Sequence, residues 1–451
     1  MKMLNDSSEL PKLKYLLTQK ILLGNEPSAE LIAILTIYFV QGILLLSRLA
    51  VSFFLKDELL LSPVQMSAIV GISTIPWMIK PLYGFISDSL PLFGYHRKPY
   101  IVLSGIIGCI AWVSLGTIVH TSSIATIMIL LSSLSVAISD VIVDSIVVER
   151  ARIETSANIG SLQSLCWGSS AIGGLCTAYF SGLLLEYFTT RTVFLITALF
   201  PLIISSVAWL ITEKPIHKEP QKSNNLKHQL GQIRQAITQK EIWLPTAFIF
   251  IWHATPNAES AFFYFTTNEL HFQPEFLGRV RLVTSFASLV GVWAFQRYFK
   301  TVPFRIMFTW GIFISTALGM TTLLLVTHTN RLLGIDDHWF SLGDSLIITV
   351  IGQLVFMPVL VLATKLCPPG IEATFFALLM SVLNLGGTVS YGLGSIMMKW
   401  LGITENQFDS LWLLIIITNC SSLIPILFIK WLPDAQVDID NSQLIANDVI
   451  S

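Results

Sequence analysis

Long runs of apolar residues, separated by short polar segments, follow one another along almost the whole chain. Each run reaches the length of about 20 residues that an α-helix needs to cross the hydrocarbon core of a bilayer. The pattern excludes a soluble enzyme with a single buried core and predicts an all-α polytopic membrane protein with twelve transmembrane helices. The predicted spans are 29–55, 63–87, 98–119, 123–149, 157–185, 191–212, 241–267, 275–298, 303–327, 341–364, 371–398 and 408–431.

Composition agrees with a membrane protein. Hydrophobic residues make up 53% of the 451 residues and charged residues 12%, against about 25% in a soluble domain. The net charge of −1 offers no basic face for nucleic acid, so the expected surroundings are a lipid bilayer. The first apolar run continues past Arg48 without a small-residue cleavage site, which indicates a retained helix and not a signal peptide.

The basic residues predict the orientation of the chain. Most of the 27 Lys and Arg residues fall in segments that share one side of the membrane with both termini, and such segments are normally cytoplasmic. The longest polar stretch between spans divides the chain into two sets of six helices, a layout typical of major facilitator transporters. The predicted parts are a tail (1–28), a first half (29–212), a linker with an amphipathic helix (213–240), a second half (241–431) and a tail (432–451).

Five stretches carry a resemblance to a known family. "IKPLYGFISDSLPLFGYHRKPY" after the second span, "SDVIVDSIVVERAR", "LQSLCWG", "NELHFQPEFLGRVRLV" and "CPPGIEATFFALLMSVLNLGG" resemble the folate–biopterin transporter family, a branch of the major facilitators. The resemblance implies import of folates or other pterins by alternating access, driven by an ion gradient. Transport of another organic anion or an amino acid on the same fold is the alternative, and an intramembrane enzyme is a more distant one.

Charged residues inside the spans are the first candidates for a substrate or coupling site, because such charges are costly and are either functional or internally paired. Arg48 and Lys80 suit the carboxylates of a folate, although Lys80 can also extend to the membrane surface. Asp140 and Asp144 lie four residues apart on one helix face. They are predicted either to relay a coupling proton or to neutralise the nearby cations.

The seventh span contains the sequence "HATPNAES", in which Pro256 is expected to interrupt the helix and expose backbone groups. His253, Asn257 and Glu259 surround the interruption, and Glu259 is the candidate for a second coupling acid. His253 has an ordinary packing role as its alternative. Further hydrogen-bonding or stacking candidates for a pterin are Gln163, Trp167, Gln353 and Asn384.

A second set of polar residues is predicted to act in gating. Asp88 ends the second span and resembles the latch aspartate of major facilitators, with Arg97 in the loop that follows. Arg279 and Arg281 are expected to form a gate with Glu269 or Glu275, or to attract an anionic substrate. The remaining gating candidates are Arg150, Lys365 and Glu372.

Other chemistries lack their motifs. The chain has no Gly-Lys-Ser/Thr phosphate loop, no His-Glu-x-x-His and no Gly-x-Ser-x-Gly, so no catalytic residue, metal site or cofactor is predicted. The five cysteines lack paired spacing. The expected protein is a monomeric, proton-coupled symporter in a bacterial plasma membrane, with a folate or pterin as substrate.

Overall fold

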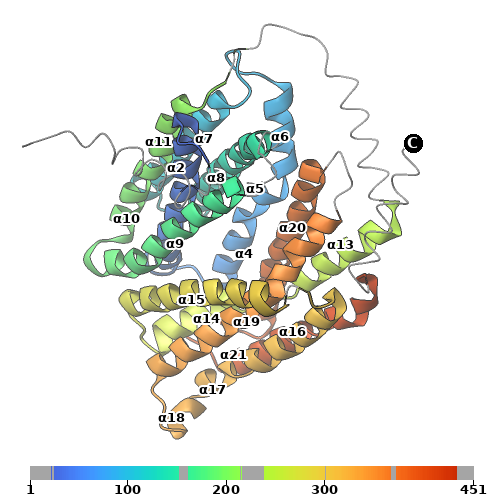
Figure 1. The fold of residues 1–451 in the computed structure, drawn as a ribbon. Coiled ribbons are helices and arrows are strands. Elements are labelled where there is room, and N and C mark those ends of the chain that lie inside the picture. Colours follow the sequence, from blue (N-terminus) through green and yellow to red (C-terminus); the bar gives the residue numbers. More distant parts are fainter. Residues whose placement is uncertain are drawn as a thin grey trace, which may run out of the picture.

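The computed structural model describes residues 22, 25–151, 161–213, 215, 238–299, 301–366 and 372–433. These residues form a helical bundle (Figure 1). The helices that follow the chain up to residue 213 are α2 (Ala29–Ile43), η2 (Leu44–Leu46), α3 (Ser47–Phe53), η3 (Phe54–Glu58), α4 (Pro63–Ser73), α5 (Ile75–Met78), α6 (Lys80–Ser89), α7 (Lys98–Thr117), α8 (Ser122–Ala151), α9 (Ser161–Tyr187), α10 (Thr190–Thr197), α11 (Leu199–Val207) and η4 (Ala208–Leu210).

The second set of helices begins after the linker, of which residues 216–237, with the predicted amphipathic helix, lie outside the described residues. Its members are α13 (Lys240–His253), α14 (Glu259–Tyr264), η5 (Phe265–Glu269), α15 (Pro274–Ala294), η6 (Phe295–Phe299), α16 (Phe304–Gly319), α17 (Thr322–Val326), α18 (Thr329–Leu332), α19 (Asp337–Lys365), α20 (Glu372–Trp400), α21 (Leu411–Ser421) and η7 (Ile424–Trp431).

Eleven stretches of the described chain are long and apolar enough to cross a membrane, one fewer than the twelve predicted. The difference lies in the seventh predicted span, 241–267, which the structure divides into α13 and α14 with the short η5. Pro256 lies in the gap and has no backbone N–H to continue a helix. The predicted interruption is confirmed, and neither piece is long enough to span the membrane alone.

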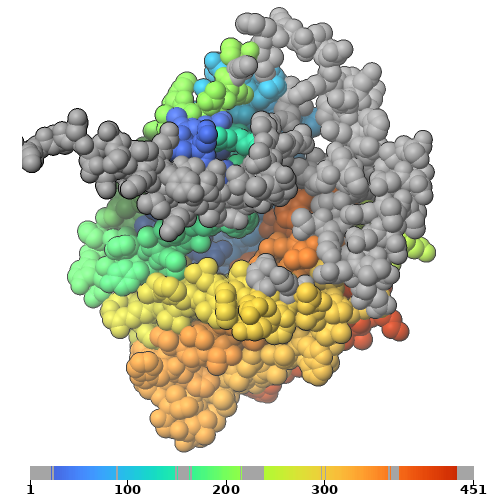
Figure 2. Space-filling view, viewed as in Figure 1, coloured from blue at the N-terminus to red at the C-terminus, as the bar shows by residue number. Residues whose placement is uncertain are grey.

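Several apolar cores hold the bundle together, and each set of helices has a large one of its own. One joins α2, α7, α8, α9 and α11 through side chains such as Ile34, Ile101 and Ile142. The other joins α13, α16, α19 and α20 around Phe248, Phe308 and Val359. Figure 2 shows residues of α15 to α19, in yellow and orange, covering the lower half of the visible face.

The first and seventh predicted spans end in the same bend. A π-helical turn (η3 or η5) is followed by a residue with positive φ, Leu60 (52°) or His271 (55°). The backbone N–H of Leu59 donates to Phe54 O at 3.0 Å, and that of Leu270 donates to Phe265 O at 3.1 Å. We call Phe54–Leu61 and Phe265–Phe272 the elbows, and the end of the bundle that holds them the elbow end.

The two sets of helices meet closely at the elbow end. Helix α9 packs on α15, and α4 packs on α20 (Figure 1). The α9–α15 crossing occurs at Gly182 and Gly278, whose backbones approach so closely that neither site has room for a side chain. On the other pair, Ser67 Oγ donates to the Tyr391 carbonyl at 3.0 Å and Ser395 Oγ to the Val64 carbonyl at 3.0 Å. The elbow end is therefore closed in this conformation.

Candidate functional site

One polar group lies within the first set of helices, and we call Tyr38, Trp77, Lys80, Asp140 and Asp144 the Lys80 group. The Lys80 ammonium forms an ion pair with Asp140 and lies 4.3 Å from the centre of the Trp77 ring. The Tyr38 hydroxyl donates a hydrogen bond to Asp144. When Lys80, Asp140 and Asp144 are ionised and Tyr38 keeps its proton, one cation faces two carboxylates, so the group carries one excess negative charge.

The backbone explains why Lys80 reaches α8. Pro76 and Pro81 divide the second span into α4, α5 and α6, and α6 begins at Lys80. Asp140 and Asp144 lie one helical turn apart on α8, so both face the same neighbours. The Lys80 and Asp140 side chains are only 15% and 16% exposed, which makes their ion pair costly to break.

A second polar group joins helices from both sets, and we call Arg48, Glu259, Arg281 and Tyr391 the Arg48 group. The Tyr391 hydroxyl donates to Glu259 Oε2 at 2.6 Å. The Arg281 guanidinium interacts electrostatically with two charged side chains, Arg48 and Glu259. Arg48 follows the 3₁₀ segment η2 in the middle of its span, and such segments often mark functional positions. Two guanidinium groups and one carboxylate leave an excess positive charge.

The gap between α13 and α14 is tied to α20. Asn257 Nδ2 donates to Ser390 Oγ at 3.1 Å, and Ser390 Oγ donates to the Thr255 carbonyl at 2.5 Å. The Asn257 carbonyl also lies directly against Gly394, where a side chain would collide with it. The interruption is therefore held in a fixed shape, with His253 before it and Glu259 after it.

Other predicted substrate residues occupy different places. Trp167 on α9 is 65% exposed. Gln353 packs against Gly291 where α19 crosses α15. Asn384 Nδ2 donates to the Trp77 carbonyl at 3.2 Å and so links α20 to the Lys80 group. The side chains of Gln163, Asp88, Lys365 and Glu372 lie outside the described part of the structure, and the roles proposed for them stay predictions.

Three of the described gating candidates, Arg97, Arg150 and Arg279, contact residues of their own set of helices. Arg97 Nη1 donates to Ser87 Oγ at 3.2 Å. Arg150 lies 3.6 Å from the Glu30 carboxylate. Arg279 pairs with Glu275 on its own helix, whereas Arg281 belongs to the Arg48 group. A direct contact across the elbow end comes instead from Lys56, whose Nζ donates to Asn268 Oδ1 at 2.9 Å.

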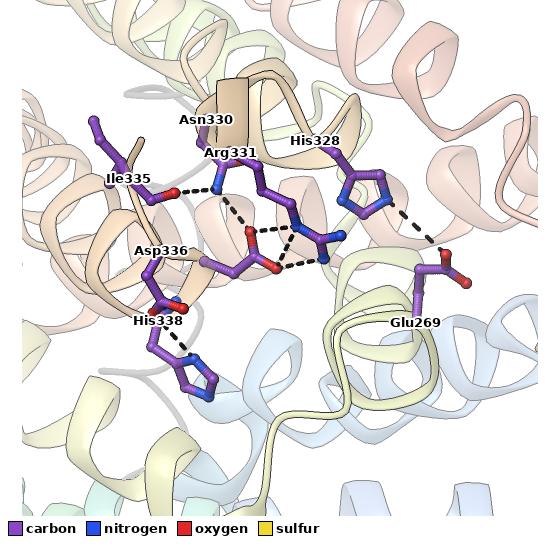
Figure 3. A network of polar contacts seen from close by, with 8 residues as sticks. Glu269, His328, Asn330, Arg331, Ile335, Asp336 and His338 are labelled. Carbon is purple, nitrogen blue, oxygen red and sulfur yellow. Dashed lines mark hydrogen bonds and ion pairs between the residues drawn. The ribbon is translucent and has the colours of Figure 1, made fainter. Parts of the chain in front are cut away.

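A further polar network covers the loop after α17 at the elbow end (Figure 3). Arg331 Nη2 lies 2.6 Å from Asp337 Oδ2, and Asn330 Nδ2 donates to Asp337 Oδ1 at 2.7 Å. The Asp337 carboxylate raises the pKa of the Arg331 guanidinium. His328 Nε2 lies 3.9 Å from Glu269 Oε1, so this loop reaches one elbow. We read the network as support for that elbow.

Several residues of these groups were not predicted from the sequence. Tyr38, Trp77 and Tyr391 lie in apolar runs, where no local pattern shows that an aromatic side chain will contact a charged one. Glu213 accepts backbone hydrogen bonds from His96, Arg97 and Lys98 and thereby caps α7. Glu213 and Arg97 are 116 residues apart, so no local signal predicts this contact, although a carboxylate at a helix N-terminus is favourable.

The arrangement of the helices is the fold of the major facilitator class. The solved nucleoside transporter NupG superposes with a TM-score of 0.66 at 14% identity, over 89% of this chain and 98% of that one. The sequence pattern of the BT1 family matches residues 41–448, and the chain belongs to that family. The predicted fold class and family are confirmed.

Named relatives agree with this assignment. A folate-biopterin transporter of Synechocystis sp. is 60% identical over 427 residues, which cover 94% of this chain and 86% of the relative. A probable folate-biopterin transporter 2 of Arabidopsis thaliana is 34% identical, over 86% of this chain and 79% of the relative. The chain is thus an integral, multi-pass membrane protein of a transporter family and not an enzyme.

Proposed function

We propose that this protein is a secondary active transporter that imports folates and related pterins. The relatives named above support the substrate class. The two halves, 29–212 and 241–431, exchange between conformations that open to opposite sides of the membrane. The repeated elbows support this division, because each half contributes one of them.

The observation that carries the proposal is the Arg48 group. Arg48 comes from the first half, and Arg281, Glu259 and Tyr391 come from the second, so a ligand bound here contacts both halves. A folate carries two carboxylates at one end, and guanidinium groups bind carboxylates through strong, directional hydrogen bonds. The excess positive charge of the group suits an anion, and its position between the halves lets binding influence their movement.

The Lys80 group supplies the coupling. One cation faces two carboxylates and forms an ion pair with only one of them, so a proton on the other would leave the group neutral. Asp144 is the carboxylate that Lys80 does not pair, and Glu259 is the second coupling acid. A proton taken from the outside and released inside would drive substrate import.

Orientation and setting complete the proposal. Both termini face the cytoplasm of a bacterial cell, the protein works as a monomer in the plasma membrane, and the closed elbow end faces outward. A conformation closed at that end corresponds to the inward-facing stage of the cycle.

Uptake of labelled folate by bacterial cells that cannot import it tests the function. We expect uptake above that of empty-vector cells, stronger at lower external pH and abolished by a protonophore. Asp140→Asn should abolish uptake because it leaves Lys80 unpaired, whereas Asp336→Asn, which changes an exposed loop carboxylate, should leave it intact. Absence of uptake from well-inserted protein would refute the substrate class, and uptake indifferent to protonophore would refute proton coupling alone.

A further inference from the structure

A half-open cavity of about 410 Å³ lies beside the gap between α13 and α14, lined by α13, the gap itself, α16, α19, α20 and Ser422. This volume is in the range of pockets for small organic ligands. Trp252, Ile312 and Val355 form an apolar wall, while Thr255, Asn257 and Ser390 present polar atoms. A flat ring with a polar edge would match both kinds of wall.

Two of the described residues that line the cavity each carry a buried polar atom without a partner. Among the described residues, His253 Nδ1 and Ser315 Oγ are buried and make no hydrogen bond. The His253 ring also interacts with the backbone of Leu383, so one ring nitrogen is engaged and the other is left over. Buried polar atoms normally have partners. An unsatisfied ring nitrogen and an unsatisfied hydroxyl in one cavity indicate an occupant that carries hydrogen-bonding groups of its own.

The cavity adjoins the Arg48 group through Tyr391. This residue lines the cavity, and its hydroxyl donates to Glu259, which in turn acts on Arg281 together with Arg48. A ligand whose ring fills the cavity and whose chain passes Tyr391 is therefore directed toward Glu259 and the rest of the Arg48 group. Folates have this form, with a flat pterin ring at one end and carboxylates at the other.

We propose that the cavity is the subsite for the uncharged heteroaromatic head of the substrate, and that the Arg48 group binds its carboxylate tail. This inference rests on the proposed function and makes it more specific. His253 Nδ1 and Ser315 Oγ exchange hydrogen bonds with the ring edge, and Trp252 and Val355 cover its faces. Head recognition thus belongs to the second half, while Arg48 of the first half helps to hold the tail.

Gly352 offers a way to fill the cavity without disturbing the helix. It lines the cavity, and a Cβ built there meets no atom within 4 Å. Gly343 lies on the same helix, also has open space around its Cβ, and is not part of the cavity wall. Gly352→Leu therefore blocks the subsite, and Gly343→Leu is its matched control. Ser315→Ala removes one unsatisfied hydroxyl, and Arg48→Gln removes a tail contact.

The experiment measures binding of three probes to the purified full-length protein by ligand-dependent shifts in its unfolding temperature. The probes are folate, pterin without a tail, and p-aminobenzoylglutamate, the tail without the pterin. Gly352→Leu should weaken pterin binding at least about tenfold and Ser315→Ala by about fivefold, both leaving the tail fragment unchanged. Arg48→Gln should do the reverse, and Gly343→Leu should match the wild type.

The outcomes separate the two proposals. If the wild type binds folate but Gly352→Leu weakens both fragments alike, or neither, the subsite assignment is wrong and the proposed function stands. If the wild type binds neither folate nor either fragment, the proposed function and the subsite fail together. Unfolding temperatures without ligand show whether each variant is folded.

Discussion

Gly182 is the position at which a single methyl group should change the balance between conformations. A Cβ built on Gly182 would lie 2.6 Å from the Pro274 carbonyl oxygen and 2.8 Å from the Gly278 Cα atom. Carbon atoms in contact normally lie about 3.5–4.0 Å apart. Because both neighbours are backbone, no side chain can move aside, and Gly182→Ala must push α9 and α15 apart by roughly 1 Å.

This separation penalises only the conformation that is closed at the elbow end. Overpacking of this kind costs about 1–3 kcal/mol, and the same helices are apart when that end is open. A penalty of that size on one of two states shifts their ratio about 5- to 150-fold. Gly182→Ala should therefore populate the state open at the elbow end without unfolding the protein.

Thiol labelling at residue 67 measures the shift. Ser67 is fully buried between α4 and α20, so a cysteine placed there reacts with a charged, impermeant reagent only when the elbow end opens. In a chain whose five native cysteines are replaced by serine, Gly182→Ala should speed labelling within the range given above. Gly168→Ala, on the same helix with open space around it, should leave the rate unchanged. An unaltered rate in Gly182→Ala would refute the reasoning.

Three further changes test other contacts. Lys56→Met removes the hydrogen bond to Asn268 across the elbow end. It should speed the same labelling about threefold to tenfold, since such a bond contributes about 1 kcal/mol. Equal labelling rates would show that this bond does not help to close the elbow end. Lys80→Met should lower the unfolding temperature more than Lys80→Met with Asp140→Asn, because a lone buried charge costs about 3–5 kcal/mol; an even less stable double variant would contradict the pairing. Glu213→Gln weakens the cap of α7 by about 1 kcal/mol and should speed proteolytic cleavage after Arg97. An unchanged cleavage rate would show that the cap does not stabilise the start of α7.

The helical architecture could be predicted from the sequence because a helix that crosses the bilayer needs an apolar run of about 20 residues. Span boundaries agree with the helices to within a few residues in most cases, and Pro256 correctly placed the interruption of the seventh span. The described chain has eleven continuous spans against twelve predicted spans, because the seventh predicted span is the one that Pro256 interrupts. Backbone geometry follows from local sequence in these places.

Which residues form the Lys80 group and the Arg48 group could be predicted from the sequence only in part. Lys80 and Asp140 were singled out by their cost inside a membrane, and their contact was one of the alternatives. Tyr38 and Asp144 are 106 residues apart, and Glu259 and Tyr391 are 132 apart. Such pairs are created by helix packing, which no local pattern encodes. The same applies to Arg281, which we expected in a gate and which interacts electrostatically with Arg48 and Glu259.

The two elbows give the protein a contact of the kind found in symmetric dimers. Lys56 in one elbow meets Asn268 in the other, and the Tyr264 hydroxyl of the second half bonds the Leu61 carbonyl of the first. In a two-fold dimer the same surface occurs on both partners and is self-complementary. Here both partners belong to one polypeptide, so each elbow is free to change its side chains independently. One elbow therefore holds the lysine that donates, and the other holds the asparagine that accepts.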